Sequence, residues 1–170
     1  MGLDEVVAEI ASHSSKTVEI TGGEPLAQKA VFPLADRLLS EGYIVLLETS
    51  GALDVSRLDP RVHKIMDLKC PGSMESDRNR WENLNHLTER DEIKFVIQDR
   101  TDYQWARNVI RQRELDQRVE EGSLRALLIS PVWEAIDLES LSTWILEDRL
   151  PVRLQVQMHK LIWEPDRQGV

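Results

Sequence analysis

Gly22, Gly23 and Glu24 directly follow a short β-branched segment, residues 16–21. Glycine adopts backbone conformations that other residues avoid, and it lets another group approach the main chain closely. The stretch also places one carboxylate, that of Glu24, beside this bare backbone. The stretch therefore predicts a binding turn at a strand end, with plain turn glycines as an equal alternative.

Other polar groups stand at the ends of further predicted strands. In parallel α/β folds, ligands bind at the carboxyl ends of the strands, so such groups meet at one rim. The sequence predicts that rim from five strand ends: residues 21–24; Glu48, Thr49, Ser50 and Gly51; Asp67, Leu68, Lys69 and Cys70; Ser130 and Pro131; and Gln157, His159 and Lys160.

Several of these residues have a plainer interpretation. Glu48 follows an apolar run, and a buried carboxylate needs either a partner or a function, so a structural salt bridge remains the alternative to a site residue. A solvated side chain is the alternative for Lys69, but Lys69 follows "IMDL", so its stem starts at the end of the sheet. His159 on its own is more typical of a packed histidine than of a ligand, and Cys70 of an inert thiol.

Hydrophobic periodicity predicts six strands that alternate with helices. The predicted strands cover residues 16–21, 43–51, 63–69, 92–98, 124–132 and 152–159, and the predicted helices cover residues 3–13, 27–42, 76–87, 100–119 and 137–149. This alternation favours an α/β fold of parallel βα units, which right-handed crossovers curl into a sheet or partial barrel. Residues 43–47 are nearly all apolar, which predicts a strand covered on both faces.

Composition narrows the class of protein. The chain has 170 residues, a net charge of −9 and one cysteine. Its length suits a single domain, residues 1–170. The acidic balance disfavours nucleic acid and anionic membranes as partners, and no apolar run is long enough for a membrane span. The start of the sequence lacks signal-peptide features, and one cysteine fits a reducing cytoplasm.

Common catalytic and metal motifs are absent from the sequence. It contains no GxSxG elbow, no phosphate-binding GxxxxGK[ST] loop, and no CxxC or HExxH metal motif. The strand-end residues are therefore the main candidates for chemistry.

The stretch "TGGEPL" resembles the GGE motif of radical S-adenosylmethionine (SAM) enzymes, whose backbone lies against the amino group of SAM. The stretches "ETSG", "MDLKCPGS", "NRWENLNHL", "EIKFVI", "LISPVW" and "LQVQMHKLIWEP" look like successive landmarks of the 7-carboxy-7-deazaguanine synthase family, from about residue 17 onward. The resemblance implies a partial parallel (β/α) barrel of the radical SAM type that lacks its first β/α unit.

The resemblance also implies a reaction. Members of the family convert 6-carboxy-5,6,7,8-tetrahydropterin to 7-carboxy-7-deazaguanine with loss of ammonia, a carbon–nitrogen lyase step in queuosine and 7-deazapurine biosynthesis. The implied cofactors are SAM, a [4Fe–4S] cluster and Mg²⁺. The implied setting is a cytoplasmic homodimer that receives electrons from a donor such as flavodoxin.

Residue roles follow from matching positions in the family. The resemblance implies substrate contacts for Thr21 and His159, and a catalytic role for Glu48. It implies SAM contacts for Gly22, Gly23, Glu24, Glu48, Asp67, Leu68, Lys69, Ser130, Pro131 and Val132. Some relatives read Ser-Pro-Lys at residues 67–69, so Asp67 and Leu68 depart from that version.

One departure outweighs the others. Radical SAM enzymes hold their cluster with three closely spaced cysteines, and Cys70 is alone and in a different segment. We therefore expect a chain without its own metal ligands, inactive by itself, whose strand at residues 17–21 is an exposed, aggregation-prone edge.

Two alternatives remain open at this point. One is a non-catalytic fragment that binds SAM or the pterin weakly, or that pairs with a full-length enzyme. The other is a different radical SAM branch, such as a glycyl-radical activase, and the ending "QVQMHKLIW" argues against it.

Overall fold

A computed structural model describes residues 2–165 and 167. Its centre is one six-stranded sheet in the order β1-β2-β3-β4-β5-β6, with every neighbouring pair parallel. The strands are β1 (Thr17–Ile20), β2 (Ile44–Thr49), β3 (His63–Asp67), β4 (Glu92–Ile97), β5 (Ala126–Pro131) and β6 (Val152–Leu154). The predicted α/β class is confirmed, and β1 is an edge strand as expected.

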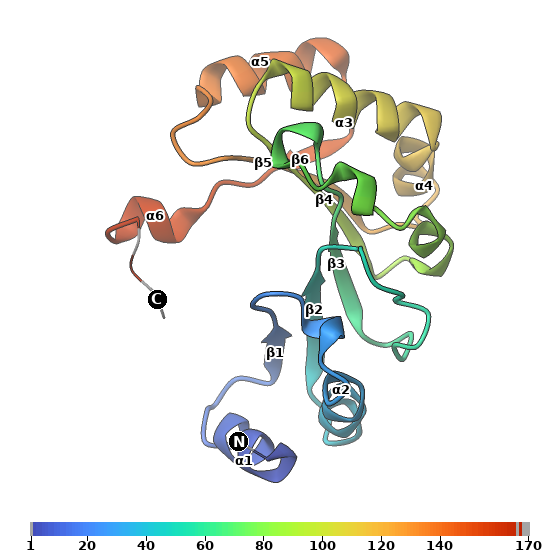
Figure 1. Ribbon diagram of the computed structural model, residues 1–170, viewed down its shortest axis with the longest axis vertical. Helices are drawn as coiled ribbons and strands as arrows, with labels where there is room; N and C mark the ends of the chain where they lie inside the picture. The colour runs from blue at the N-terminus through green and yellow to red at the C-terminus, as the bar shows by residue number, and fades with distance from the viewer. Residues whose placement is uncertain (1, 166, 168–170) are drawn as a thin grey trace.

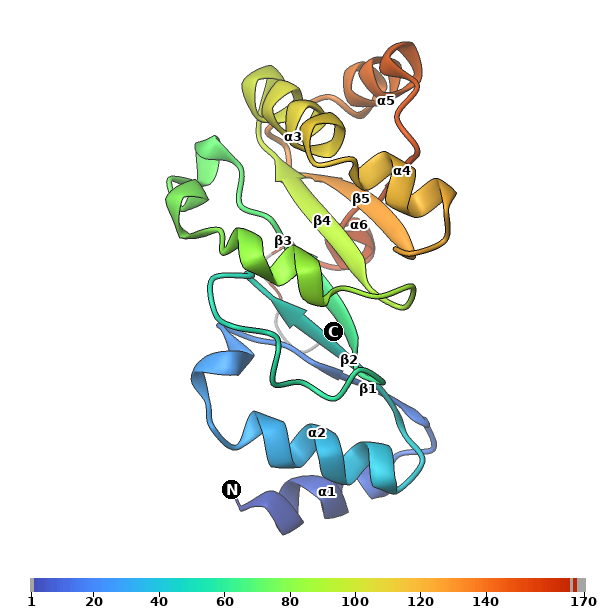
Figure 2. The same ribbon diagram turned by 90° about the vertical axis from the view of Figure 1, so that its right-hand side faces the viewer.

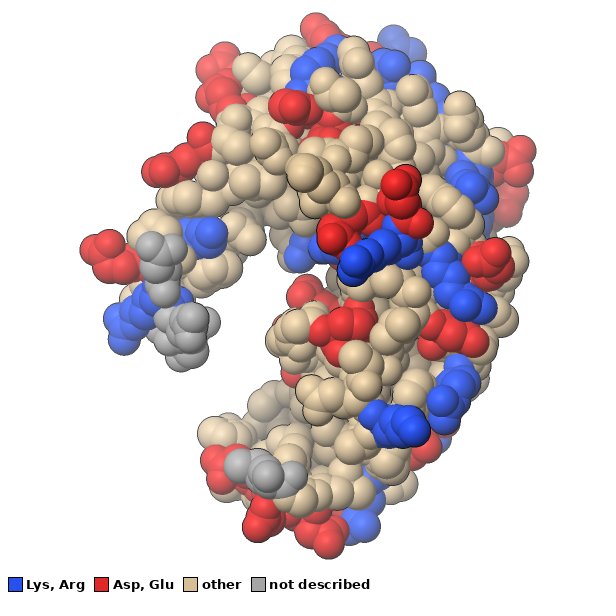
Figure 3. Space-filling view, viewed as in Figure 1, with Lys and Arg blue, Asp and Glu red and all other residues tan. Residues whose placement is uncertain are grey.

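Helices α2 to α5 lie on the outer face of this curved sheet, and the inner face borders a hollow that is open on one side, where α6 lies (Figures 1, 2 and 3). The α-helices are α1 (Leu3–Ala11), α2 (Val31–Ser40), α3 (Arg100–Gln112), α4 (Leu115–Glu120), α5 (Leu138–Asp148) and α6 (Met158–Ile162). Four 3₁₀ turns are η1 (Pro25–Ala27), η2 (Pro71–Ser73), η3 (Ser76–Arg78) and η4 (Trp81–His86). Within the described part, no helix has the length and apolarity that a membrane crossing needs.

Alternation along the strands places the hydrophobic core on the outer face. Val45 and Leu47 of β2 pack in one core cluster with residues of α2, and Ile93 and Phe95 of β4 pack in a second cluster with residues of α3. The predicted cover on both faces of β2 is wrong, because Ile44 on its inner face is 51 % exposed. The inner face is therefore free to carry the polar side chains of a site.

The helix predicted at residues 76–87 is wrong: this segment forms the separate turns η3 and η4. Asn79 exchanges hydrogen bonds with the backbone N–H and C=O of Lys69, both at 2.9 Å. Asn83 accepts from the N–H of Val55 and donates to the carbonyls of Gly51 and Leu53. Side chains that bond distant backbone compete with helix formation, and here they tie the segment to the loops after β2 and β3.

Two further boundaries differ from the prediction. The helix predicted at residues 100–119 is broken into α3 and α4 by Glu114, whose φ of 54° is left-handed. The strand predicted at 152–159 ends at Leu154. The N–H of Gln155 still donates to the carbonyl of Ile129. The next hydrogen bond of the β5–β6 ladder would need an N–H at Pro131, and proline has none. His159 therefore lies on α6 rather than at a strand end.

Candidate functional site

A cavity of about 110 Å³ lies on the inner face at the carboxyl ends of β1 to β4. Its lining residues are Thr21, Gly23, Glu48, Thr49, Ser50, Ile65, Asp67, Lys69 and Lys94. Seven residues that the sequence singled out at three strand ends are thus brought together: Thr21, Gly23, Glu48, Thr49, Ser50, Asp67 and Lys69. The agreement concerns their position, and their binding roles stay predictions.

The glycine turn after β1 has a backbone that other residues avoid. The φ angles of Gly22 and Gly23 are 91° and 54°, both in the left-handed region. A Cβ at either position would meet nothing within 4 Å, so backbone conformation rather than crowding selects glycine in the unliganded chain. The space beside the turn is free for a ligand to approach the main chain.

Glu24 fixes this turn to the end of β2. Its carboxylate accepts hydrogen bonds from the Thr49 hydroxyl at 2.8 Å, the Ser50 N–H at 2.8 Å and the Leu26 N–H at 3.1 Å. The Ser50 hydroxyl also donates to it. Because both oxygens accept these hydrogen bonds, the Glu24 carboxylate has a structural role that the sequence did not indicate. The SAM contact predicted for Glu24 is therefore a prediction about its backbone.

Glu48 ends β2 with its carboxylate toward the cavity. Its Oε2 accepts from the Thr21 hydroxyl at 3.3 Å, and its Oε1 lies 3.7 Å from the Lys94 ammonium. Its side chain is 37 % exposed. Both the site interpretation and the salt-bridge interpretation fit this geometry, since the ion pair is too long for a hydrogen bond and leaves the carboxylate accessible.

The charges of Glu48 and Lys94 also act on Glu19 of β1. Partial burial and the Glu48 carboxylate raise the pKa of Glu19, while Lys94 opposes the increase. A raised pKa means that the folded chain holds this proton more tightly than the unfolded chain, so stability declines as the pH rises through that range.

We expect Glu19→Gln to increase the melting temperature slightly at pH 7, because it removes an unfavourable charge. The gain should shrink as the pH falls through the range in which Glu19 is protonated, which lies above that of an ordinary glutamate because its pKa is raised. Thermal melts across this pH range check the prediction, with the exposed Glu9→Gln as the matched control. A gain that is independent of pH would contradict it.

Asp67 and Lys69 form the third side of the cavity. The Lys69 ammonium donates to Asp67 Oδ2 at 2.6 Å, and Asn79 holds the Lys69 backbone. Asp67 Oδ1 is buried and has no hydrogen-bond partner among the described residues. An unpartnered buried oxygen of this kind is an acceptor for a ligand N–H.

Asp102 supports the neighbouring loop and was not identified from the sequence. It is 2 % exposed, and it accepts from the N–H of Gly72 at 2.8 Å and of Gln98 at 3.1 Å. A Cβ at Gly72 would lie 2.6 Å from Asp102 Oδ2, so only glycine fits there. An aspartate near a helix start is typical of ordinary capping, so the sequence carried no signal for this contact.

The remaining predicted residues lie outside the cavity. Leu68 and Ser130 are buried, at 0 % and 2 % exposure, and Leu68 packs in the core. Pro131 and Val132 line a separate hollow of about 370 Å³ with Gln157 and Leu161. His159 is exposed on α6 and does not line either space.

Cys70 does not suit a metal centre. Burial, with smaller effects from Asp102 and Asp67, raises the pKa of its thiol, whereas a metal ligand is a thiolate. Among the described residues no group of three His, Cys, Asp or Glu side chains is placed to hold a metal ion. The residues present therefore do not fit a [4Fe–4S] cluster.

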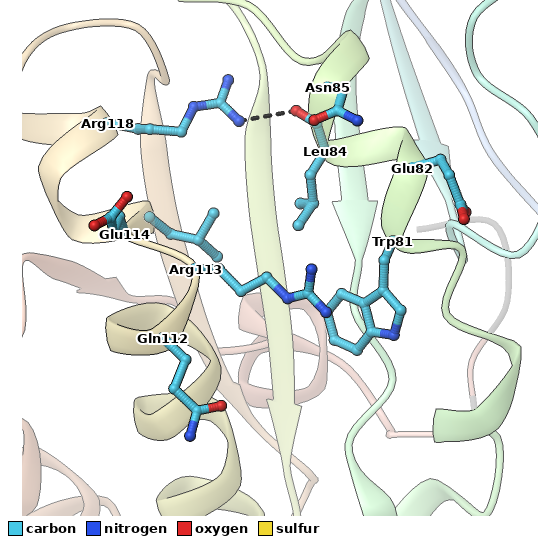
Figure 4. Close-up of a pocket in the computed structure, with 9 residues that line it drawn as sticks. Trp81, Glu82, Leu84, Asn85, Gln112, Arg113, Glu114 and Arg118 are labelled. Carbon is cyan, nitrogen blue, oxygen red and sulfur yellow. Dashed lines mark hydrogen bonds between the residues drawn. The ribbon is translucent and has the colours of Figure 1, made fainter.

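Another hollow, of about 500 Å³, lies between η4 and the α3–α4 corner (Figure 4). Arg113 lies over the Trp81 ring at 4.1 Å, and Arg118 donates to the carbonyls of Leu84 and Leu87 at 2.9 and 2.8 Å. Both arginines are thus engaged with the chain itself, and we interpret this hollow as a packing feature between two elements.

Comparison with known proteins places the chain in a family. No protein-family model matches the sequence. A 7-carboxy-7-deazaguanine synthase of Koribacter versatilis is 42 % identical over 184 residues, covering 100 % of this chain and 79 % of the relative. One of Chlorobaculum tepidum is 39 % identical over 173 residues, covering 100 % of this chain and 76 % of the relative.

A solved structure shares the fold. Streptococcus suis SuiB bound to S-adenosylmethionine matches with a TM-score of 0.59 at 12 % identity, over 89 % of this chain and 40 % of that one. This likeness agrees with the predicted α/β partial barrel. On the sequence identities, the chain belongs to the 7-carboxy-7-deazaguanine synthase family.

Proposed function

We propose that this chain forms the SAM- and substrate-binding face of a 7-carboxy-7-deazaguanine synthase, acting in the ring contraction of 6-carboxy-5,6,7,8-tetrahydropterin. The observation that carries the proposal is the inner-face cavity, which gathers Thr21, Gly23, Glu48, Asp67 and Lys69 from three strand ends. The relatives are named synthases, which supports an enzyme. The carbon–nitrogen lyase class is assigned from the family resemblance alone.

In the proposed complex, each part of the cavity meets a part of the ligands. The free backbone at Gly22 and Gly23 receives the ammonium end of SAM, and the unpartnered Asp67 Oδ1 accepts a further N–H. Thr21 and Glu48, joined by a hydrogen bond, lie where the pterin approaches. The contacts assigned to Leu68 are made by its backbone, because its side chain is in the core.

The radical chemistry itself requires a cluster that the described residues do not fit. In the family that this chain resembles, a [4Fe–4S] cluster and Mg²⁺ would be the inorganic cofactors, and the cluster would supply the reducing electron. The share of this chain is to bind both organic ligands, to orient them and to exclude water from between them.

Titration calorimetry with SAM and with the carboxylated pterin tests this function. We expect saturable binding of both ligands and, for Glu48→Gln, affinity that is at least about 10-fold lower, because a charged hydrogen-bond partner is lost. Glu89→Gln, whose side chain is 65 % exposed and does not line the cavity, is the matched control. Absence of binding by the unaltered chain would overturn the proposal.

A non-catalytic binding protein is the second candidate, favoured by the poor fit to a cluster. Incubation with SAM, the pterin, iron, sulfide and a reductant, followed by mass spectrometry, separates the two. Product made by the chain alone would overturn both the inactivity that we expect and this second candidate.

We propose that the chain is a single domain and that it forms a homodimer in the cytoplasm. The proposed electron donor for the enzyme is a protein such as flavodoxin. The continuous sheet supports one domain. Met158, Leu161 and Ile162 on α6 are 64 %, 62 % and 59 % exposed, which supports an intersubunit contact. The location and the donor stay predictions from the family resemblance.

A further inference from the structure

Lys94 is a charged residue in the middle of an apolar strand. Its neighbours in β4, Ile93 and Phe95, are fully buried on the outer face, so alternation directs Lys94 to the inner face. There it lines the cavity, pairs in register with Asp67 of β3, and keeps 21 % of its side chain exposed. Its charged end lies where a ligand in the cavity would be.

The Lys94 ammonium is only loosely compensated. Its one ion pair, with Glu48, spans 3.7 Å, and among the described residues its Nζ makes no hydrogen bond. Two other lysines differ: Lys69 bonds to Asp67 at 2.6 Å, and the buried Lys64 lies 3.0 Å from Asp91. A half-buried ammonium with three free N–H donors has capacity for a second anion.

The nearby carboxylates do not supply that second anion. Asp67 Oδ2 is bonded to Lys69, and the Glu24 oxygens bond to Thr49, Ser50 and Leu26. Glu48 forms the ion pair with Lys94, and its Oε2 is shared with Thr21. The carboxylates of Glu19 and Asp67 also lie near Lys94, but among the described residues neither forms an ion pair with it. The pair leaves the ammonium oriented by one carboxylate and open toward the cavity.

We infer that Lys94 is a ligand-binding residue of this site, whose ammonium binds a carboxylate of the bound ligand while Glu48 orients it. The inference rests on the proposed function and extends it, since no role was assigned to Lys94 there. Two ligands carry the required group: the methionyl end of SAM and the carboxylated pterin. One ammonium contacts one of them directly.

The experiment compares each carboxylated ligand with an analogue that lacks the carboxylate. Dissociation constants are measured for SAM and decarboxylated SAM, and for 6-carboxytetrahydropterin and tetrahydropterin. The proteins are the unaltered chain, Lys94→Met, Lys94→Arg and the exposed control Lys29→Met. Melting temperatures confirm folding, and Lys94→Gln replaces Lys94→Met if the latter does not fold.

We expect Lys94→Met to weaken the binding of one carboxylated ligand by about 10- to 100-fold, the range for a lost charged hydrogen bond. Its analogue should be unaffected, Lys94→Arg should restore part of the affinity, and Lys29→Met should match the unaltered chain. The ligand that responds identifies the source of the carboxylate.

Two results would overturn the inference. One is an equal effect of Lys94→Met on a ligand and its analogue, which would indicate a merely structural lysine. The other is no effect on either carboxylated ligand while the unaltered chain binds both, which leaves the proposed function standing. If the unaltered chain binds neither ligand, the proposed function fails and the inference fails with it.

Discussion

Asp91→Ala will lower the free energy of unfolding by about 3–5 kcal/mol, the range for removing one partner of a buried ion pair. Lys64 and Asp91 lie 3.0 Å apart, with side chains 3 % and 0 % exposed. Asp91 also accepts from the N–H of Lys64 and of Thr88, both at 2.7 Å. The variant therefore leaves a buried ammonium and two backbone donors without their acceptor.

Urea unfolding of the variants measures this loss. Asp59→Ala, which breaks an exposed pair with Arg61, is the matched control and should cost about 1 kcal/mol or less. The double variant Lys64→Met with Asp91→Ala should be more stable than Asp91→Ala, because it removes the uncompensated charge. Equal losses for Asp91→Ala and Asp59→Ala would show that the buried pair is unimportant.

Glu24→Ala will reduce both stability and SAM binding. The Glu24 carboxylate is the acceptor that joins the glycine turn after β1 to Thr49 and Ser50 at the end of β2. Without it, the Thr49 hydroxyl and the Ser50 and Leu26 N–H groups lose their acceptor. At about 1–3 kcal/mol for each buried unsatisfied group, we expect a total loss of about 2–4 kcal/mol, with part of the cost relieved by water.

The binding effect arises because the turn is no longer held at the cavity. We expect SAM affinity at least about 10-fold lower at a temperature where the variant is still folded. The SAM affinity of Glu24→Gln should be intermediate, since its amide oxygen still accepts hydrogen bonds while its NH₂ group faces other donors. Glu9→Ala, on the exposed face of α1, is the control. A folded Glu24→Ala chain with unchanged SAM affinity would contradict this account of the turn.

The strands and the rim follow from local patterns in the sequence. Apolar runs ending in Glu48 or Asp67 identify both a strand and the point where its carboxyl end emerges, because parallel strands share one direction. This reasoning placed Thr21, Gly23, Glu48, Asp67 and Lys69 together without knowledge of the register.

The contacts that support the rim depend on long-range geometry. Asn79 and Asn83 replace a predicted helix with 3₁₀ turns through bonds to loops up to 32 residues away, which no local pattern reveals. Lys94 was visible as a charge within an apolar strand, but its side depends on the register with β3. The strand predicted to reach His159 ended early because of Pro131 in the neighbouring strand.

Hydrogen–deuterium exchange with and without SAM tests the central claim most directly, namely that the inner-face rim is the cofactor site. We predict that saturating SAM slows exchange in peptides covering residues 20–24, 47–51 and 66–70. Exchange should be unchanged in residues 81–87 and 112–118, which surround the hollow between η4 and the α3–α4 corner, the outer hollow. Saturable binding that protects the outer hollow and not the rim would contradict the account.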